Sequence, residues 1–220
     1  GFVSRGLGDV YKRQEYEHRS QYLHTLTQCM TDSMGLTGTD TVCGIVPMFH
    51  AMGWGIPWSA LMLGCKQVMP HRFMDPARLL DLMVAEKVTL SAGVPTIWQG
   101  VKGLYEANPD AYDLSALSRL TCGGSSPPPS LIRWFWDELD VEMIQGWGMT
   151  ETSPLATLSR RVMKRSQLAL SEDEQFENVA KAGQLMPGLE LDIFDEEFNR
   201  LPHDGETVGE ILAVSYTHLR

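Results

Sequence analysis

Short apolar segments alternate with amphipathic ones along this 220-residue chain, and this alternation constrains the fold more than any other feature. A chain that alternates strand and helix four or five times builds a parallel sheet that helices cover on both faces. The predicted fold class is therefore α/β. We expect strands over 41–46, 66–70, 88–92, 117–122 and 141–145.

Helix signals lie before and between these strands. Leu23, Leu26, Met30 and Met34 recur at spacings of three and four, which predicts an amphipathic helix over 14–34. A second helix is expected after a loop at 47–50 and ends at about residue 63. A third begins after an N-cap at 75 and has a buried apolar stripe at 79, 80, 83 and 84. Two more are expected over 95–107 and over 127–139.

The character of the sequence changes after Thr152. Residues 160–178 are polar, which is typical of a surface loop or a loop with one helical turn. Two strands are expected over 189–195 and 208–214, with a turn at 203–205. These signals predict an α/β part over 15–158, followed by a loop and the start of a mainly antiparallel β subdomain over 159–214.

Composition excludes two classes of protein. The 18 basic and 28 acidic residues give a formal net charge of −10, and no dense basic run is present, which argues against nucleic-acid binding. Residues 41–65 carry no formal charge, but two prolines, a histidine and four glycines would break an isolated membrane-spanning helix there. A buried strand, a loop and a buried helix fit this stretch better, so we expect no transmembrane segment.

Other features indicate the compartment. Cys29, Cys43, Cys65 and Cys122 form no CxxC pair, and they are interpreted as reduced, mostly buried thiols. Residues 1–14 lack the apolar centre of a secretory signal. We therefore expect a cytoplasmic protein.

Four unusual turns each follow a predicted strand, at 47–50, 93–96, 123–126 and 146–151. Ligands of open parallel sheets bind outside the carboxyl ends of the strands, so these turns are expected to line one cleft. Each turn also has an ordinary structural interpretation. The turn at 123–126 would then only start a helix, and His50 and Trp54 would be core residues.

Thr150 and Glu151 point to nucleotide chemistry. They end a predicted buried strand and follow two glycines that flank Trp147. In such a site Trp147 would stack on a base, Thr150 would bond a phosphate oxygen and Glu151 would hold a hard divalent cation. The alternative for Glu151 is a solvated turn carboxylate.

The segment 145–154, Gln-Gly-Trp-Gly-Met-Thr-Glu-Thr-Ser-Pro, resembles the adenine-and-magnesium motif of the adenylate-forming (AMP-binding) enzymes. Segments 16–20, 46–54, 92–98 and 123–127 resemble motifs of the medium- and long-chain fatty acyl-CoA synthetase branch, in the same order. The resemblance implies that a fatty acid attacks ATP to give an acyl-adenylate and pyrophosphate, after which coenzyme A (CoA) takes the acyl group. It implies Mg²⁺ as cofactor, and fatty acid, ATP and CoA as partners.

The resemblance also implies roles for individual residues. Thr150 would bond the adenylate phosphate, Glu151 would bind Mg²⁺ and His50 would lie by the substrate carboxylate. Trp54 matches a tryptophan that gates the acyl tunnel of long-chain members, and Gly93 and Val94 would form part of the acyl pocket. The nucleotide would be surrounded by Gly123, Gly124, Ser125, Gln145, Gly146, Trp147, Gly148, Met149 and Thr150.

The chain departs from the family pattern at both ends. The phosphate loop expected before residue 16 has no counterpart in 1–14, and the lysine-bearing C-terminal domain is not in the sequence. Segments 1–14 and 215–220 resemble translated adapter sequence. We expect an internal fragment of the large N-terminal domain, inactive alone. A homo-oligomer is compatible with the sequence.

Two alternatives remain open at this stage. One is another adenylate-forming enzyme, such as an aryl- or amino-acid-activating ligase or a luciferase-like oxidase. The apolar run from Met48 to Met62 favours an aliphatic substrate over these. The other is a non-catalytic nucleotide- or acyl-binding fragment.

Overall fold

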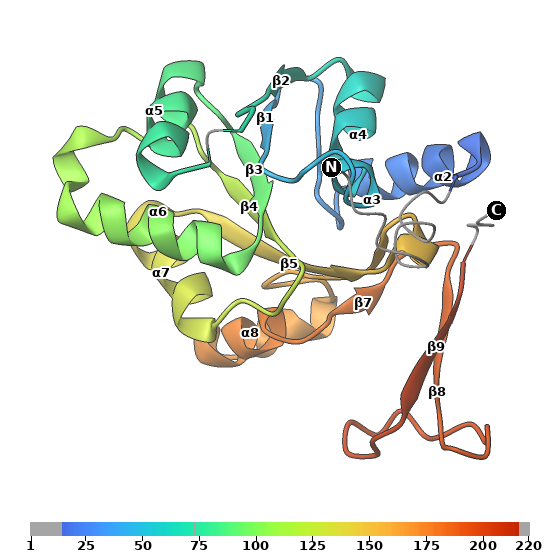
Figure 1. Ribbon diagram of the computed structural model, residues 1–220. Helices are drawn as coiled ribbons and strands as arrows, with labels where there is room; N and C mark the ends of the chain where they lie inside the picture. The colour runs from blue at the N-terminus through green and yellow to red at the C-terminus, as the bar shows by residue number, and fades with distance from the viewer. Residues whose placement is uncertain (1–14, 73, 216–220) are drawn as a thin grey trace, which may run out of the picture.

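A seven-stranded sheet forms the centre of the computed structural model, which describes residues 15–72 and 74–215 (Figure 1). Its strand order is β2-β1-β3-β4-β5-β6-β7; the first five strands are parallel, and β6 and β7 are antiparallel to their neighbours. The α/β expectation is confirmed. The strands are β1 (Thr41–Gly44), β2 (Lys66–Val68), β3 (Leu90–Gly93), β4 (Arg119–Cys122), β5 (Glu142–Gly148), β6 (Leu155–Ser159) and β7 (Gln184–Leu185).

Helices connect the parallel strands, as expected. The helices are α2 (His18–Cys29), α3 (Ala51–Trp54), α4 (Ile56–Leu63), α5 (Pro76–Glu86), α6 (Pro95–Ala107), α7 (Pro129–Leu139) and α8 (Glu172–Val179), with short 3₁₀ turns at Pro109–Ala111, Thr150–Thr152 and Arg165–Ala169. Asp75 caps α5 as expected, because its side chain accepts a hydrogen bond from the Arg78 N–H. The predicted adapter-like segments 1–14 and 215–220 lie outside the described residues, except for residue 215.

The sheet has a hydrophobic core on each face. One core joins α5, α6, α7 and α8, and its centre holds Trp98 and Phe135, which pack edge to face with ring centroids 6.4 Å apart. The other core holds Ile56 and Ala60 of α4 together with Met34 and Ile144. A parallel sheet buries apolar side chains on both faces, and the two cores provide this for the strands inside the edge strand β2.

Helix α2 is shorter than predicted and turned the other way. It ends at Cys29 rather than at residue 34, and the side chains of Leu26 and Met30 are 42% and 44% exposed. The face that it buries is polar and includes His24 and Gln28. The spacing of the apolar residues predicted a helix correctly but gave the wrong buried face. The polar face can be buried because His24 and Gln28 form hydrogen bonds with neighbouring segments.

Residues after Thr152 add two strands to the main sheet. Strand β6 pairs with β5 across a register shift between Trp147 and Gly148, and β7 pairs with β6. The polar segment 160–178 was expected to be a surface loop or a loop with one helical turn. It instead includes most of the eight-residue helix α8, which ends at Val179 and is capped by Ser171. The sequence did not predict β6 and β7, because β7 is an edge strand of two residues and β6 is a short buried strand whose position is set by its antiparallel pairing with β5.

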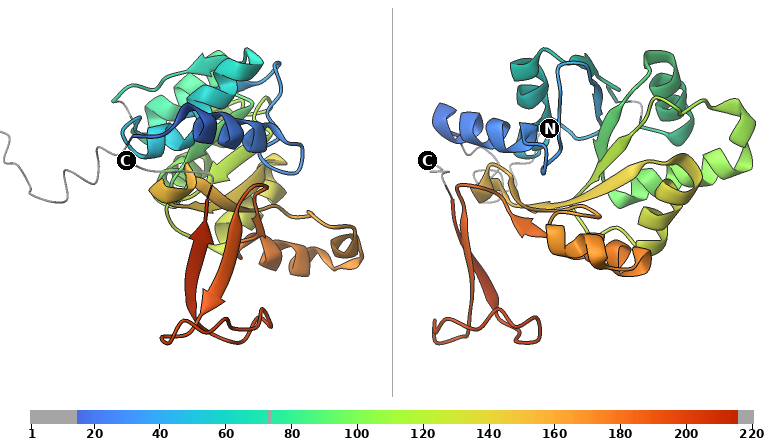
Figure 2. Two further views of the ribbon diagram at one scale, coloured as in Figure 1. Left: turned by 90° about the vertical axis from the view of Figure 1, so that its right-hand side faces the viewer. Right: turned by 180° about the vertical axis from the view of Figure 1, so that it is seen from behind.

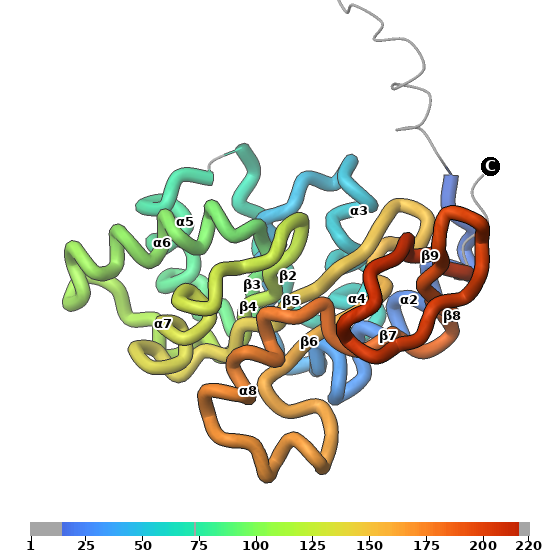
Figure 3. The backbone as a smooth tube through the Cα atoms, turned by 90° about the horizontal axis from the view of Figure 1, so that it is seen from below, coloured from blue at the N-terminus to red at the C-terminus, as the bar shows by residue number. Residues whose placement is uncertain are grey.

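A hairpin of β8 (Glu190–Phe194) and β9 (Glu210–Val214) projects from the main sheet as a second, antiparallel sheet (Figures 1 and 2). Seen from below, α5, α6 and α7 lie at one end of the molecule and the hairpin at the other (Figure 3). These strands confirm the expected start of an antiparallel part. A boundary after residue 158 stays a prediction, since β6 and β7 extend the main sheet beyond it.

The uncharged stretch 41–65 folds as strand β1, a loop and the helices α3 and α4. Gly55, with a φ of +75°, separates the two helices that had been predicted as one. Within 15–72 and 74–215, no helix has the length and apolar character needed to cross a membrane.

Candidate functional site

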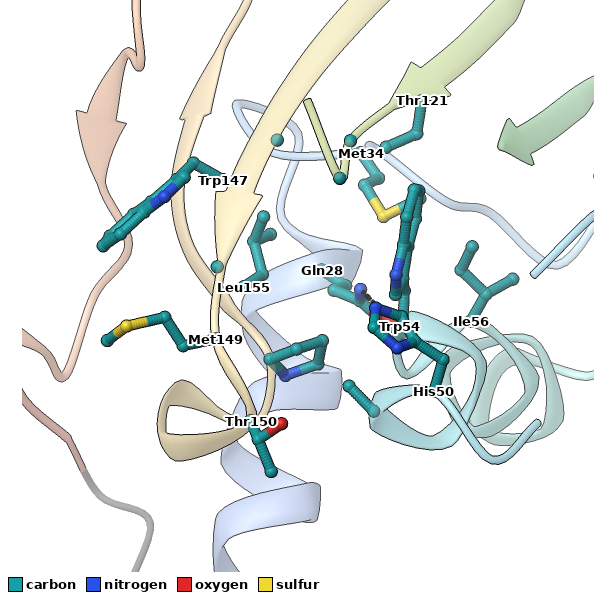
Figure 4. Close-up of a pocket in the computed structure, with 16 residues that line it drawn as sticks. Gln28, Met34, His50, Trp54, Ile56, Thr121, Trp147, Met149, Thr150 and Leu155 are labelled. Carbon is teal, nitrogen blue, oxygen red and sulfur yellow. Dashed lines mark hydrogen bonds between the residues drawn. The ribbon is translucent and has the colours of Figure 1, made fainter. Parts of the chain in front are cut away.

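A cavity of about 240 Å³ lies where the turns after β4 and β5 face the segment 50–56 (Figure 4). The expected turns at 47–50, 123–126 and 146–151 contribute to it, whereas the turn at 93–96 does not. Its lining residues are Gln28, Met34, His50, Ala51, Trp54, Ile56, Thr121, Gly123, Gly124, Gly146, Trp147, Gly148, Met149, Thr150, Pro154 and Leu155. None of these side chains is an aspartate, glutamate, lysine or arginine.

Nine of the predicted site residues line the cavity, and five do not. Gly93 and Val94 lie behind the cavity wall that Gly123 and Gly124 form. Val94 packs against the side of Gly124, where a Cβ would be 3.2 Å from Val94 Cγ1, and Gly93 packs against Trp98, where a Cβ would be 3.1 Å from the ring. Glu151 is exposed beside Thr150. Gln145 is buried and accepts a hydrogen bond of 3.4 Å from the Ser126 hydroxyl, while Ser125 follows the glycine pair.

The turn that carries Thr150 and Glu151 is closed on itself. The Met149 N–H donates to the Pro154 carbonyl at 3.0 Å and to the Thr152 hydroxyl at 2.9 Å. A Cβ at Gly148 would be 2.0 Å from the Pro154 carbonyl oxygen, so only glycine fits this approach. The turn therefore presents Thr150 to the cavity while Glu151 faces solvent.

Tyr16 braces this turn from a distant part of the chain. Its hydroxyl donates a hydrogen bond of 2.8 Å to the Thr150 carbonyl oxygen. Burial raises the pKa of Tyr16, and the nearby Glu151 charge raises it further, so the phenol keeps the proton that it donates. The sequence placed Tyr16 in a family motif but gave it no role.

The opposite wall is formed by His50 and Trp54. His50 is exposed and lines the cavity, which corrects its interpretation as a core histidine. Trp54 is half-buried and packs over the glycine pair, since a Cβ at Gly123 would be 3.1 Å from its ring. Figure 4 shows Trp54 and His50 on one side and Trp147 and Met149 on the other, with Thr150 between them.

Helix α2 supplies two side chains that sequence reasoning missed. Gln28 lines the cavity and donates a hydrogen bond of 2.7 Å to the Trp54 carbonyl oxygen. His24 is fully buried, and its Nε2 accepts a hydrogen bond of 3.1 Å from the Leu155 N–H. Burial lowers the pKa of His24 to about 3, so the ring is neutral. The spacing of four between these polar residues within a helix was the signal that could have found them.

The donor set constrains which metal the site could take. Among residues 15–72 and 74–215, no group of three histidine, cysteine, aspartate or glutamate side chains is placed to hold a metal ion. Mg²⁺ is commonly bound by only one or two carboxylates, with phosphate oxygens and water as the other ligands. The exposed Glu151 carboxylate beside the cavity fits that mode. Thr121 also lines the cavity, and its hydroxyl makes no hydrogen bond to any described residue.

Comparison with known proteins gives relatives over nearly the whole chain. It is 40% identical over 198 residues to the medium-chain-fatty-acid–CoA ligase of Ectopseudomonas oleovorans, covering 90% of this chain and 36% of the relative. It is also 40% identical over 206 residues to the long-chain-fatty-acid–CoA ligase of Thermus thermophilus, covering 94% of this chain and 37% of that protein. The chain therefore spans little more than a third of the length of these relatives.

Solved structures show the same fold. A long-chain-fatty-acid-CoA ligase from Archaeoglobus fulgidus superimposes with a TM-score of 0.74 at 22% identity, covering 91% of this chain and 38% of that one. The sequence profile of the AMP-binding enzymes matches residues 15–218. With the motifs at 145–154 and 123–127 on one cavity and this profile spanning the chain, the protein belongs to the AMP-binding enzyme family.

Proposed function

We propose that this chain is part of a fatty acyl-CoA synthetase, which joins a fatty acid to CoA and converts ATP to AMP and pyrophosphate. The observation that carries the proposal is the cavity between Thr150 and Trp54. Its lining includes no aspartate, glutamate, lysine or arginine. Such a cavity suits an aliphatic chain next to a nucleotide site. The two relatives at 40% identity are named as ligases of medium- and long-chain fatty acids.

The first step is adenylation. A carboxylate oxygen of the fatty acid attacks the α-phosphorus of ATP, the bond to the β-phosphate oxygen breaks, and pyrophosphate leaves with the electron pair. Thr150 is assigned to hydrogen-bond an α-phosphate oxygen, and His50 to lie by the attacking carboxylate from the opposite wall. The adenine and phosphate are assigned to Gly123, Gly124, Ser125 and the segment 145–149.

Glu151 is assigned to hold Mg²⁺, because it is the exposed carboxylate nearest in sequence to Thr150 and the bound ATP would supply the remaining oxygen ligands. When bound, the ion offsets phosphate charge during the displacement. Within the described residues, the cavity itself supplies no lysine or arginine for that purpose. Thr150 and the backbone N–H groups of the surrounding turns supply neutral hydrogen bonds only.

The second step transfers the acyl group. The CoA thiolate attacks the acyl carbon, the acyl–phosphate bond breaks, and AMP leaves. Trp54 contacts the acyl chain in this proposal, with Gly93 and Val94 in the layer behind it. An amino-acid-activating ligase would need a carboxylate in the cavity to hold the ammonium group, and the lining includes none.

We also propose that the reaction takes place in the cytoplasm. All four cysteines are free, and Cys43, Cys65 and Cys122 are buried. Burial raises the pKa of Cys122 to about 12 and that of Cys43 to about 11, so neither thiol is reactive at neutral pH. A reducing compartment suits a protein with this set of thiols.

The test uses a full-length protein that carries residues 15–215. Decanoate, hexadecanoate, benzoate and phenylalanine are each incubated with ATP, Mg²⁺ and CoA, and loss of free thiol is followed. We expect thioester from the two fatty acids at rates at least about tenfold above those from benzoate and phenylalanine. Preference for either of the latter would select another branch of the family, and nucleotide binding without turnover of any acid would select the non-catalytic alternative.

A further inference from the structure

The segment that carries Trp54 has an unusual backbone. Residues Ala51, Met52, Gly53, Trp54 and Gly55 all have positive φ values, of 40°, 48°, 63°, 57° and 75°. Three of the five are not glycine, and L-residues rarely adopt this left-handed region because Cβ approaches the following carbonyl oxygen. A run of such residues persists only where the surroundings hold it.

Gln28 holds this turn from helix α2. It is 2% exposed, its Nε2 donates a hydrogen bond of 2.7 Å to the Trp54 carbonyl oxygen, and its Oε1 accepts one of 2.6 Å from the Ser59 hydroxyl. Trp54 ends α3 and Ser59 belongs to α4. One side chain therefore spans the break at Gly55 and fixes both helices to α2.

The fit around the break is close. A Cβ at Gly55 would lie 2.5 Å from the His24 ring and 3.1 Å from Gln28 Oε1. His24 is in turn fixed by its hydrogen bond with the Leu155 N–H. The turn thus rests against a polar surface that also contacts the opposite wall of the cavity.

The position of the turn sets the position of the Trp54 ring. The carbonyl of Trp54 points to Gln28, and its ring packs over the backbone of Gly123, where a Cβ would be 3.1 Å away. Figure 4 shows Gln28, Trp54 and His50 gathered on the same side of the cavity. Among the described residues, Gln28 supplies the side-chain hydrogen bond to the Trp54 carbonyl oxygen, and no other side chain replaces it.

We propose that Gln28 is a positioning residue for Trp54, holding the left-handed turn 51–55 in place and so setting the length of acyl chain that the cavity accepts. This inference rests on the proposed function, because it takes the cavity to receive the acyl chain. Gln28 acts through Trp54 and not on the nucleotide. Its loss therefore changes the selection of the acid and leaves the use of ATP nearly unchanged.

The test compares Gln28→Met with Gln21→Met, a matched control on the same helix whose side-chain oxygen is buried without a hydrogen bond to any described residue. In a full-length protein, kcat/KM is measured for hexanoate, decanoate and hexadecanoate, together with the KM for ATP. We expect Gln28→Met to shift the hexadecanoate-to-hexanoate ratio about fivefold or more, with less than about a twofold change in the KM for ATP. Gln21→Met leaves the ratio as in the unsubstituted protein. Equal changes in the ratio and in the KM for ATP would overturn the proposal.

A second measurement does not depend on activity. Hydrogen exchange of the amides in 51–56 is followed by mass spectrometry, because the Gly53 N–H donates to the His50 carbonyl and the Gly55 N–H to the Met52 carbonyl. We expect exchange at least about tenfold faster in Gln28→Met than in Gln21→Met. Ser59→Ala removes the hydroxyl that donates to Gln28 Oε1 at 2.6 Å and to the Gly55 carbonyl oxygen at 3.3 Å, but it keeps the Gln28 hydrogen bond to Trp54. It gives a smaller increase and serves if Gln28→Met does not fold. Unchanged exchange overturns the inference, whereas failure of every fatty acid to react overturns the proposed function instead.

Discussion

The Tyr16 hydroxyl and the Thr150 carbonyl oxygen are 2.8 Å apart, so the beginning of the described chain holds a turn that lies 134 positions later. Tyr16→Phe removes the donor and leaves a carbonyl without its partner. If Thr150 binds phosphate, kcat/KM for ATP should fall about five- to tenfold. Steady-state kinetics in a full-length protein check this. Tyr22→Phe is the control, since Tyr22 is 57% exposed on α2, and an equal loss there would count against a specific role for Tyr16.

Trp54 is expected to affect the acid more than the nucleotide. Trp54→Ala enlarges the cavity beside Gly123 and should change the preference among hexanoate, decanoate and hexadecanoate about tenfold, with a smaller change in the KM for ATP. Trp58→Ala is the control, because Trp58 is 41% exposed on α4. Equal effects of Trp54→Ala on acid and ATP would make Trp54 an ordinary packing residue.

A largely buried ion pair lies at the amino ends of the parallel strands, away from the cavity. Arg119 contacts Asp40 at 2.6 Å and donates to the Met34 and Gly35 carbonyls. Burial alone would raise the pKa of Asp40, but hydrogen bonds from Thr89 and Thr37 and the Arg119 charge outweigh it, so that pKa lies below its ordinary value.

Arg119→Met leaves the Asp40 charge buried without its partner. We expect the free energy of unfolding to fall by about 3 kcal/mol, measured by urea denaturation of the 220-residue chain. Lys66→Met removes an exposed pair with Glu86 and should cost less than about 1 kcal/mol. Similar costs for the two variants would show that the Arg119 pair does not stabilise the fold.

His24 makes stability depend on pH. Burial lowers its pKa from 6.5 to about 3, so between these values the unfolded chain binds more protons than the folded one. Above pH 6.5 His24 is neutral in both states and does not change the free energy of unfolding. Between pH 6.5 and about 3, that free energy falls by about 1.4 kcal/mol for each pH unit.

The check is urea denaturation of the chain at pH 5 and pH 7.5. His24→Gln should reduce the difference in unfolding free energy between the two conditions by about 2 kcal/mol. Gln21→Met, which removes no titratable group from the same helix, should leave that difference unchanged. A difference that His24→Gln does not alter would mean that His24 is not held neutral.

Much of the sheet could be read from the sequence because its strands are buried on both faces. Strands of that kind form continuous apolar runs, and β1, β3, β4 and β5 were all expected within a few residues of their bounds. Helix α2 was the opposite case. Its apolar spacing is real, but tertiary partners of His24 and Gln28 decided which face is buried.

The candidate site was predictable to the extent that it consists of turns at strand ends. His50, Trp54, Gly123 and Thr150 meet there because parallel strands end at one edge. Gln28 and Leu155 were not predicted, because they come from a helix face and an antiparallel strand that no local pattern connects to that edge. Such contacts depend on packing between segments more than 100 residues apart, as for His24 and Leu155.

The central claim is that Thr150 and Glu151 serve formation of a fatty acyl-adenylate. It is tested most directly by ATP–pyrophosphate exchange in a full-length protein without CoA, using decanoate and Mg²⁺. We predict exchange that requires decanoate and that falls more than about tenfold in Glu151→Gln, while Glu138→Gln, at an exposed position on α7, leaves it unchanged. Decanoate-dependent exchange at an unaltered rate in Glu151→Gln would contradict the account.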